Sequence, residues 1–185
     1  YDAKAIRQSP QLEGYARRGV EVLVLSDPVD AFWVRSALGY DGKPFQSVTQ
    51  GAADLDKIPL AEGAEESEAA PEGAVATLAA RFKQTLGDKV NAVRSSARLT
   101  TSPVCLVASD FAMDRQLEKI LSANDQLKAR TAPVLELNPT HPLIKALDDA
   151  AVLLFGEARI LDGEPPDDPA DFSARIARLI ERGLA

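Results

Sequence analysis

The stretch Pro133-Val134-Leu135-Glu136-Leu137-Asn138-Pro139 places a short apolar run directly before a helix start. Apolar side chains at nearly successive positions are typical of a strand that is covered on both faces. Asparagine followed by proline favours a helix start, because asparagine caps free backbone N–H groups and proline fits the first helical turn. We therefore predict a strand over 133–137 and a long helix from Asn138 to about Gly156.

Two further strands are expected upstream of this one. Residues 104–108 form a continuous apolar run, and residues 90–99 alternate imperfectly between apolar and polar side chains. The link Thr100-Thr101-Ser102-Pro103 suits a hairpin or a short loop. Helices are predicted over 75–87 and 110–122, from apolar residues spaced three and four apart. This order indicates a three-stranded sheet with helices around it.

The first 50 residues are predicted to form a separate small α/β unit. Ser9-Pro10 begins a helix that ends at Gly19. Residues 20–25 then form an apolar run typical of a strand covered on both faces. Asp27-Pro28 begins the next helix, which ends at Gly39.

A change of composition marks a domain boundary. Residues 51–72 hold seven acidic residues and one lysine, too few apolar groups to offset chain entropy by burial. We predict an α/β (α+β) protein with a first domain over 1–60, an acidic linker over 61–71 and a second domain over 72–185.

The composition excludes several classes of protein. Lys and Arg number 21 against 28 Asp and Glu, and this net charge of −7 gives no general attraction to nucleic acid or anionic membranes. A single cysteine, Cys105, excludes a disulfide framework, and a single histidine, His141, excludes two-histidine metal sites. The sequence shows neither a membrane-spanning stretch nor a signal peptide, and it does not begin with Met. We expect a soluble, cytoplasmic piece of a longer protein, with no metal or cofactor of its own.

The reactive side chains do not indicate catalysis. Cys105 lies in the apolar run 104–108, where a thiol is normally an inert core group. His141 lies at a predicted helix start, which disfavours an imidazolium and favours a surface or helix-start role. Gly42-Lys43 lacks the other residues of a phosphate-binding loop. We therefore expect no catalytic residues in this chain.

One predicted helix carries a narrow apolar stripe. Met113, Leu117, Ile120 and Leu121 fall on one face of the helix over 110–122. A methionine in such a stripe suits an adaptable contact surface, because its flexible side chain repacks easily. The pattern leaves two alternatives open, since the same stripe would also pack against the neighbouring sheet.

The two C-terminal helices carry more apolar surface than they can hide against each other. Pairing of two chains into a four-helix bundle would bury both faces. Each buried Leu, Ile or Phe would then contribute roughly 1.5–3 kcal/mol. The alternative is that both helices cover the sheet of their own chain. The predicted dimer interface consists of Leu143, Leu147, Ala151, Leu154, Phe172, Ile176, Leu179 and Ile180.

Four stretches occur here in the order in which they occur in the Hsp90 family of molecular chaperones. They are Ser9-Pro10-Gln11-Leu12-Glu13, Val20-Glu21-Val22-Leu23-Val24-Leu25-Ser26-Asp27, Tyr40-Asp41-Gly42-Lys43-Pro44-Phe45 and Glu136-Leu137-Asn138-Pro139. In order and spacing the chain resembles this family over essentially its whole length, and its bacterial form most closely. The resemblance implies that 1–60 correspond to the end of the middle domain and 72–185 to the C-terminal dimerisation domain. It also implies that the nucleotide-binding domain, with its ATP and magnesium, lies outside this chain.

The resemblance further implies a surface for non-native client proteins, and it favours an exposed position for the apolar stripe. The residues carried over are Phe32, Trp33, Met113, Leu117, Ile120 and Leu121. Ser36 departs from the family pattern, which has a large residue one turn after Phe32. The implied partners are a second copy of the chain, client proteins and co-chaperones, with no nucleic acid and no membrane.

A competing interpretation is a free-standing dimeric scaffold or regulatory domain without a client surface. It shares the predicted dimer with the chaperone interpretation. The two differ in whether the stripe around Met113 binds other proteins.

Overall fold

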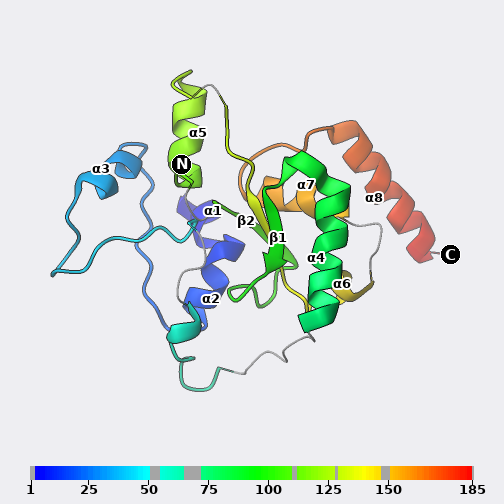
Figure 1. Cartoon of the computed structure of the whole chain (residues 1–185), viewed down its shortest axis with the longest axis horizontal. Coiled ribbons are helices and arrows are strands. Elements are labelled where there is room, and N and C mark those ends of the chain that lie inside the picture. Colours follow the sequence, from blue (N-terminus) through cyan, green and yellow to red (C-terminus); the bar gives the residue numbers. More distant parts are fainter. Residues whose placement is uncertain are drawn as a thin grey trace.

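The computed structural model describes residues 3–50, 55–64, 72–109, 112–127, 129–146 and 151–184. Helices and short 3-10 turns surround a three-stranded sheet (Figure 1). In chain order the elements are α1 (Ala3–Arg7), η1 (Pro10–Leu12), α2 (Glu13–Ala16), α3 (Asp30–Ser36), η2 (Leu55–Lys57), α4 (Glu72–Leu86), η3 (Gly87–Lys89), β1 (Ala92–Ser95), β2 (Val104–Val107), α5 (Arg115–Ala123), β3 (Val134–Leu137), α6 (Pro142–Ala146), α7 (Ala151–Leu161) and α8 (Pro169–Leu184). The helices and mixed sheet agree with the predicted α/β class.

The strand predicted over 133–137 is the centre of the sheet. The strand order is β1-β3-β2, with β3 parallel to β1 and antiparallel to β2. Every residue of β2 and β3 is buried, as their apolar runs predict. Because β3 lies between β1 and β2, the segment 100–103 is a loop and not a hairpin.

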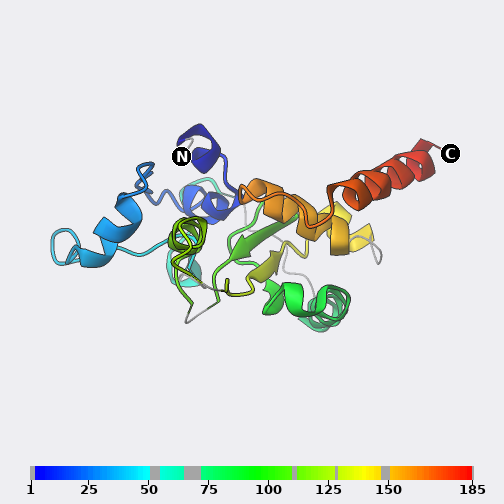
Figure 2. The same ribbon diagram turned by 90° about the horizontal axis from the view of Figure 1, so that it is seen from above.

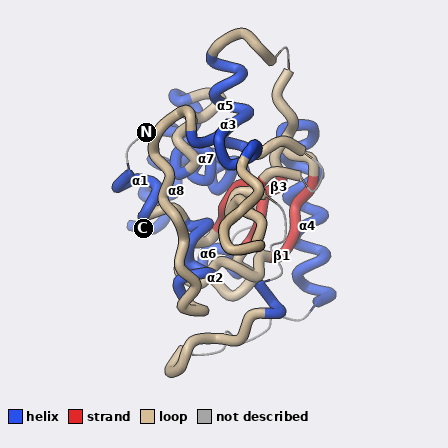
Figure 3. The backbone as a smooth tube through the Cα atoms, turned by 90° about the vertical axis from the view of Figure 1, so that its left-hand side faces the viewer, coloured by secondary structure: helices blue, strands red, loops and turns tan. Residues whose placement is uncertain are grey.

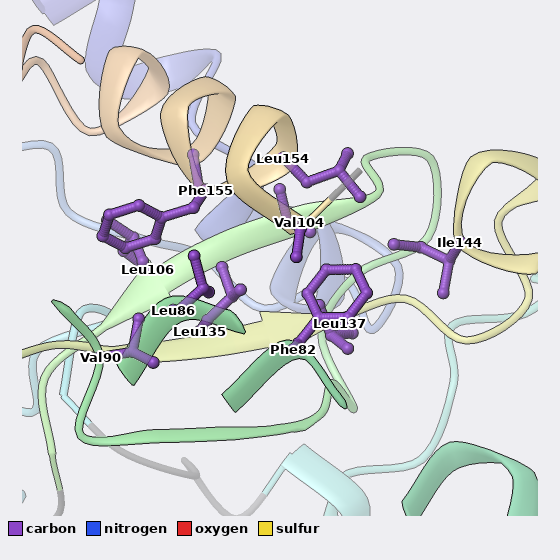
Figure 4. Packing of buried hydrophobic residues seen from close by; sticks show 12 residues of the cluster. Phe82, Leu86, Val90, Val104, Leu106, Leu135, Leu137, Ile144, Leu154 and Phe155 are labelled. Carbon is purple, nitrogen blue, oxygen red and sulfur yellow. The ribbon is translucent and has the colours of Figure 1, made fainter. Parts of the chain in front are cut away.

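One face of the sheet is covered by α4 and α7, which share a single core cluster with β2 and β3. Phe82 of α4 and Phe155 of α7 pack there with Leu106, Leu135 and Leu137 (Figure 4). Side chains alternate along a strand, so the neighbouring residues of β2 and β3 point to the opposite face.

That opposite face is covered in part by the N-terminal segment. The Gln11 side chain of η1 donates a hydrogen bond of 2.5 Å to the backbone oxygen of Leu106 in β2. Ser9 caps η1 by accepting the N–H of Gln11, and Gly19, with a φ of 64°, follows α2. The predicted start and end of this helical segment are therefore confirmed.

The strand predicted over 20–25 is wrong. These residues pair with no strand of the described chain. Val22 and Val24 are half-buried, but Leu23 is 69% exposed. A strand needs backbone hydrogen bonds from a neighbour, and apolar composition alone does not supply one.

The acidic stretch 51–72, which includes the predicted linker, contacts the first unit over part of its length. Leu55 is buried, and the Ala61 N–H donates a hydrogen bond of 3.1 Å to the backbone oxygen of Arg17. Residues 51–54 and 65–71 lie outside the described residues. Leu55 therefore buries apolar area in a stretch that was expected to bury little.

The helix expected over 110–122 begins later, at Arg115 of α5. The Asp114 carboxylate accepts the N–H groups of Gln116 and Leu117, at 2.8 and 3.1 Å, and so defines the helix start. Met113 therefore lies before the helix and not on its face.

The helix expected from Asn138 also begins later, at Pro142 of α6. The Asn138 side chain accepts the N–H of Thr140 instead, and His141 Nδ1 accepts the N–H of Leu143. His141 thus has the predicted helix-start role, with Pro142 in the first turn.

Gly156 does not end a helix, because α7 continues to Leu161. A Cβ atom at Gly156 would lie 2.7 Å from the ring of Phe172 in α8. Glycine is therefore needed here for the close approach of α8. Asp168 caps α8 as predicted, since its Oδ1 accepts the N–H groups of Ala170 and Asp171.

α8 lies at one end of the molecule and extends away from the sheet, whereas α3 lies at the other end (Figure 2). Within the described residues, every helix is too short or too polar to cross a membrane.

Candidate protein-binding surfaces

α3 presents large apolar side chains on the outside of the molecule. Its start is fixed by Asp27, which accepts the N–H of Val29, and by Asp30, which accepts the N–H of Asp27, both at 3.0 Å. Every residue of α3 is exposed or half-buried. Phe32 and Trp33 are 42% and 49% exposed. Side chains of this size are usually buried, so neighbouring exposed ones indicate a contact surface.

A tight turn after α3 returns the chain alongside it. Tyr40 and Lys43 exchange two backbone hydrogen bonds of 2.9 Å across Asp41-Gly42, both of which have positive φ angles. Phe45 then lies beside Trp33, with 5.4 Å between the ring centroids. This ring contact holds Trp33 in place and leaves about half of its surface exposed.

α5 contacts α3 and supplies the second part of this surface (Figure 3). Met113, Ile120 and Leu121 are half-buried, but Leu117 is only 2% exposed. Leu117 lies in the middle of the stripe on α5, so the centre of the stripe faces the body of the molecule. The prediction of an exposed stripe is therefore wrong for Leu117 and holds in part for the other three. We call Phe32, Trp33, Met113, Ile120 and Leu121 the α3–α5 surface.

The N-terminal end of α5 is tied to the segment that follows Phe45. Asp114 caps α5 with Oδ1, and its Oδ2 accepts the hydroxyl groups of Ser47 and Thr49. One carboxylate thus joins the two parts of the α3–α5 surface.

Buried charges tie the same helix to the turn between α7 and α8. Arg115 Nε lies 3.0 Å from Asp162 Oδ2, and Lys119 Nζ lies 2.9 Å from the same oxygen. Glu164 in this turn pairs with Arg130 at 2.7 Å. The side chains of Arg115 and Asp162 are at most 10% exposed, so each charge needs its partner in the folded chain.

α8 carries the second apolar surface. Ile176, Leu179 and Ile180 are 39%, 39% and 56% exposed and lie on one face of the helix. Phe172 begins the same face, is half-buried and packs on Gly156. We call these four residues the α8 surface.

The other predicted interface residues have different positions. Ala151 and Leu154 of α7 are buried in the core cluster of their own chain, so their assignment to an exposed interface is corrected. A helix between a sheet and solvent needs an apolar face even without a partner chain. Leu143 of α6 is 44% exposed. Leu147 lies outside the described residues.

A buried cluster of charges lies on the face of the sheet opposite α4 and α7. Glu136 of β3 accepts hydrogen bonds from Arg98 Nε at 2.8 Å, Ser96 Oγ at 2.9 Å and Arg94 Nη2 at 3.1 Å. Arg98 Nη1 also donates to the backbone oxygen of Val48, at 2.6 Å. Glu136 and Arg98 are both buried, and the apolar and capping patterns of the sequence do not single them out as site residues. The available signal was an acidic residue between Leu135 and Leu137 in a strand expected to be covered on both faces.

Comparison with known families identifies the relationship. The family model described as Hsp90 protein matches residues 1–185, which is the whole chain. The chain belongs to the Hsp90 family. The resemblance expected from the four sequence stretches is thereby confirmed.

Relatives of this Hsp90-family chain bear the name chaperone protein HtpG. The protein of Nitrobacter winogradskyi is 54% identical over 195 residues, covering 99% of this chain and 30% of that protein. Those of Nitrobacter hamburgensis and Azorhizobium caulinodans are 50% and 49% identical, over 99% of this chain and 30% and 31% of theirs. The chain thus spans about 30% of the length of the curated relatives it matches.

The cysteine of this Hsp90-family chain has the properties of a core residue. Cys105 is buried in β2, and its Sγ lies 3.8 Å from Glu136 Oε2. Burial raises the pKa of the Cys105 thiol well above its ordinary value, and the negative charge of Glu136 raises it further. A thiol of this kind stays protonated and does not act as a nucleophile at neutral pH.

A carboxylate clasp joins the two parts of the Hsp90-family chain. Glu13 of α2 accepts the backbone N–H groups of Thr100 at 2.6 Å, Thr101 at 2.9 Å and Ser102 at 3.2 Å. The hydroxyl groups of all three residues donate to the same carboxylate. Burial alone would raise the pKa of Glu13, but the hydrogen bonds from Ser102, Thr100 and Thr101 outweigh it, so the pKa lies below its ordinary value of 4.5. The ionised form is therefore the one that the loop stabilises.

We expect Glu13→Gln to lower the free energy of unfolding at neutral pH by about 1–3 kcal/mol, because the hydrogen bonds lose their charged acceptor. Since the folded pKa lies below 4.5, the carboxylate stabilises the fold above that pH. This contribution is lost as the pH falls through the folded pKa. Denaturant unfolding over a series of acid pH values should therefore show a smaller acid loss for the variant. Equal acid losses in the two proteins would contradict the assignment.

Proposed function

We propose that this chain is the part of an Hsp90-type chaperone that pairs two protomers and holds non-native proteins. Pairing takes place through the α8 surface, and client proteins bind at the α3–α5 surface. Nucleotide and magnesium binding belong to the remaining part of the longer protein. The observation that carries the proposal is the exposure of large apolar side chains on two separate surfaces of an Hsp90-family chain.

Self-pairing is supported by the shape and chemistry of α8. The helix extends from the body of the molecule (Figure 1). Three apolar side chains on one of its faces, Ile176, Leu179 and Ile180, are exposed. Because the α8 surface is one continuous stripe, two copies can bury it against each other by a two-fold rotation. Without such pairing, these apolar side chains would remain exposed to water. The net charge of −7 shows that the chain is otherwise strongly polar.

Client binding is supported by the kind of side chains on the α3–α5 surface. Phe32 and Trp33 offer aromatic area without a fixed hydrogen-bond pattern, and Met113 adds a flexible side chain. Non-native proteins share exposed apolar groups but no common shape, so an adaptable apolar surface fits them.

We expect Phe32→Ser combined with Trp33→Ser to weaken binding of an unfolded protein by at least about tenfold, as truncation of aromatic anchors at interfaces commonly does. Both side chains are exposed, so the fold should be retained. Reduced, carboxymethylated α-lactalbumin serves as the permanently unfolded probe, and binding is measured by fluorescence anisotropy.

The matched control is Ile58→Ser combined with Ile160→Ser, which removes two exposed apolar side chains outside the α3–α5 surface. The control should bind the probe as the unaltered chain does. Loss of binding in the control and in the Phe32 and Trp33 variant alike would contradict this site. A chain that forms dimers but never binds the probe would instead be a dimeric scaffold.

A further inference from the structure

The α3–α5 surface is built from two parts of the chain that are far apart in sequence. α3 belongs to the N-terminal unit, by which we mean residues 3–50, and α5 follows the strand β2. The surface therefore exists only while the N-terminal unit keeps its place against the sheet.

The Glu13 clasp is a heavily bonded contact between these two parts. One carboxylate receives three backbone N–H groups and three hydroxyl groups from residues 100–102. Successive backbone N–H groups that converge on one point form a nest for an anion. Thr100, Thr101 and Ser102 carry no charge, so Glu13 supplies the charge of this contact.

Close packing beside the clasp fixes the orientation of α2. A Cβ atom at Gly14 would lie 2.6 Å from the Arg98 Cα, so only glycine allows α2 this close to the chain beyond β1. Gln11 binds the Leu106 backbone oxygen one turn earlier. The clasp thus lies at the centre of a joint made by residues 11–14.

A second contact lies at the far end of the N-terminal unit. Ser47 and Thr49 donate their hydroxyl groups to Asp114, the capping residue of α5. Residues between α2 and Ser47, including all of α3, are therefore held between two anchors. Release of the first anchor would leave the far end of the unit held by the contacts around Ser47–Thr49, where Arg98 also donates to the Val48 backbone oxygen at 2.6 Å, and would remove the charged contact at the near end.

We propose that Glu13 is a positioning residue that latches the N-terminal unit to the loop 100–102 and so assembles the α3–α5 surface. This inference rests on the proposed client-binding function of that surface. Glu13 itself is not part of the surface and acts through the placement of Phe32 and Trp33.

The test compares Glu13→Gln with Glu21→Gln, which removes the same charge from an exposed position of the N-terminal unit. Spin labels at Ser36→Cys and Asn124→Cys, both exposed, report the distance between α3 and the end of α5. Cys105 is buried and does not compete for the label. Glu13→Gln should lengthen and broaden the distance distribution, whereas Glu21→Gln should leave it unchanged.

Binding of carboxymethylated α-lactalbumin should fall about tenfold in Glu13→Gln and remain unchanged in Glu21→Gln. Adding Glu13→Gln to the Phe32 and Trp33 variant should cause no further loss, because the latch acts through those two side chains. Thr101→Val, which removes one hydroxyl donor and keeps the backbone N–H, should give a smaller change of the same kind.

Identical label distances in Glu13→Gln and Glu21→Gln would overturn the latch. If the Phe32 and Trp33 variant binds the probe normally, the proposed function fails, and the label distances still decide whether the latch exists. A widened distance with normal probe binding would overturn the link between latch and client surface.

Discussion

Glu136→Ala is expected to lower the free energy of unfolding by about 3–5 kcal/mol, the usual cost of breaking a buried ion pair from one side. Glu136 lies on the central strand β3, and its two carboxylate oxygens are occupied by Arg94, Ser96 and Arg98. Without the carboxylate, the buried Arg98 guanidinium loses its ion pair with Glu136 and keeps its bond to the Val48 backbone oxygen. A marginally stable domain loses much of its folded population at such a cost.

Denaturant unfolding followed by circular dichroism measures this effect. The matched control is Glu21→Ala, which removes an exposed carboxylate and should change the free energy of unfolding by less than about 0.5 kcal/mol. Replacing both partners, with Glu136→Leu and Arg98→Met, should recover part of the loss, because the buried positive charge that Glu136 neutralises is then removed as well. Equal stabilities of the Glu136→Ala and Glu21→Ala variants would contradict the role of the cluster.

Ile176→Asp combined with Ile180→Asp is expected to abolish the proposed pairing of two chains. Both side chains are exposed in the single chain, so aspartate there leaves the fold intact. In a bundle of α8 helices, four carboxylates would have to leave water without partners. The expected solution mass of the variant is that of one chain, 19.8 kDa.

The control for this prediction adds two charges to the opposite side of α8. Ala170→Asp combined with Ala174→Asp changes two exposed residues outside the apolar stripe and should leave the proposed pairing intact. Light scattering on a sizing column compares the two variants. An Ile176 and Ile180 variant that keeps the mass of the control would show that α8 is not the interface.

Features with a local cause were predictable from the sequence. The strands β2 and β3 follow from continuous apolar runs, and the start of α8 follows from Asp168 and Pro169. The segment 20–25 is also mostly apolar, but it pairs with no strand among the residues that the structure describes. Composition reports that a segment can enter a sheet, whereas pairing depends on a distant part of the chain.

Helix starts were misplaced where two capping residues compete. Asn138 precedes a proline, yet His141 and Pro142 make the actual start of α6. Asp110 and Asp114 both suit a cap, and the structure uses Asp114, which also binds Ser47 and Thr49. That choice depends on residues far away in sequence.

The candidate surfaces were predictable only as apolar stripes. Leu117, Leu154 and Ile176 each lie in a helix stripe whose apolar residues are three and four positions apart. Leu117 and Leu154 are nevertheless buried in their own chain, whereas Ile176 is exposed. Periodicity shows that one helix face is apolar and does not show what covers it. The Glu13 clasp and the Glu136 cluster depend on pairs 38 or more residues apart, which no local pattern reveals.

The most direct test of the proposed function is the solution mass of the unaltered chain, measured by light scattering at micromolar concentration. Pairing through the α8 surface predicts a mass near twice the 19.8 kDa of one chain. A mass of one chain across the micromolar range would contradict the assignment of α8 as a self-pairing surface.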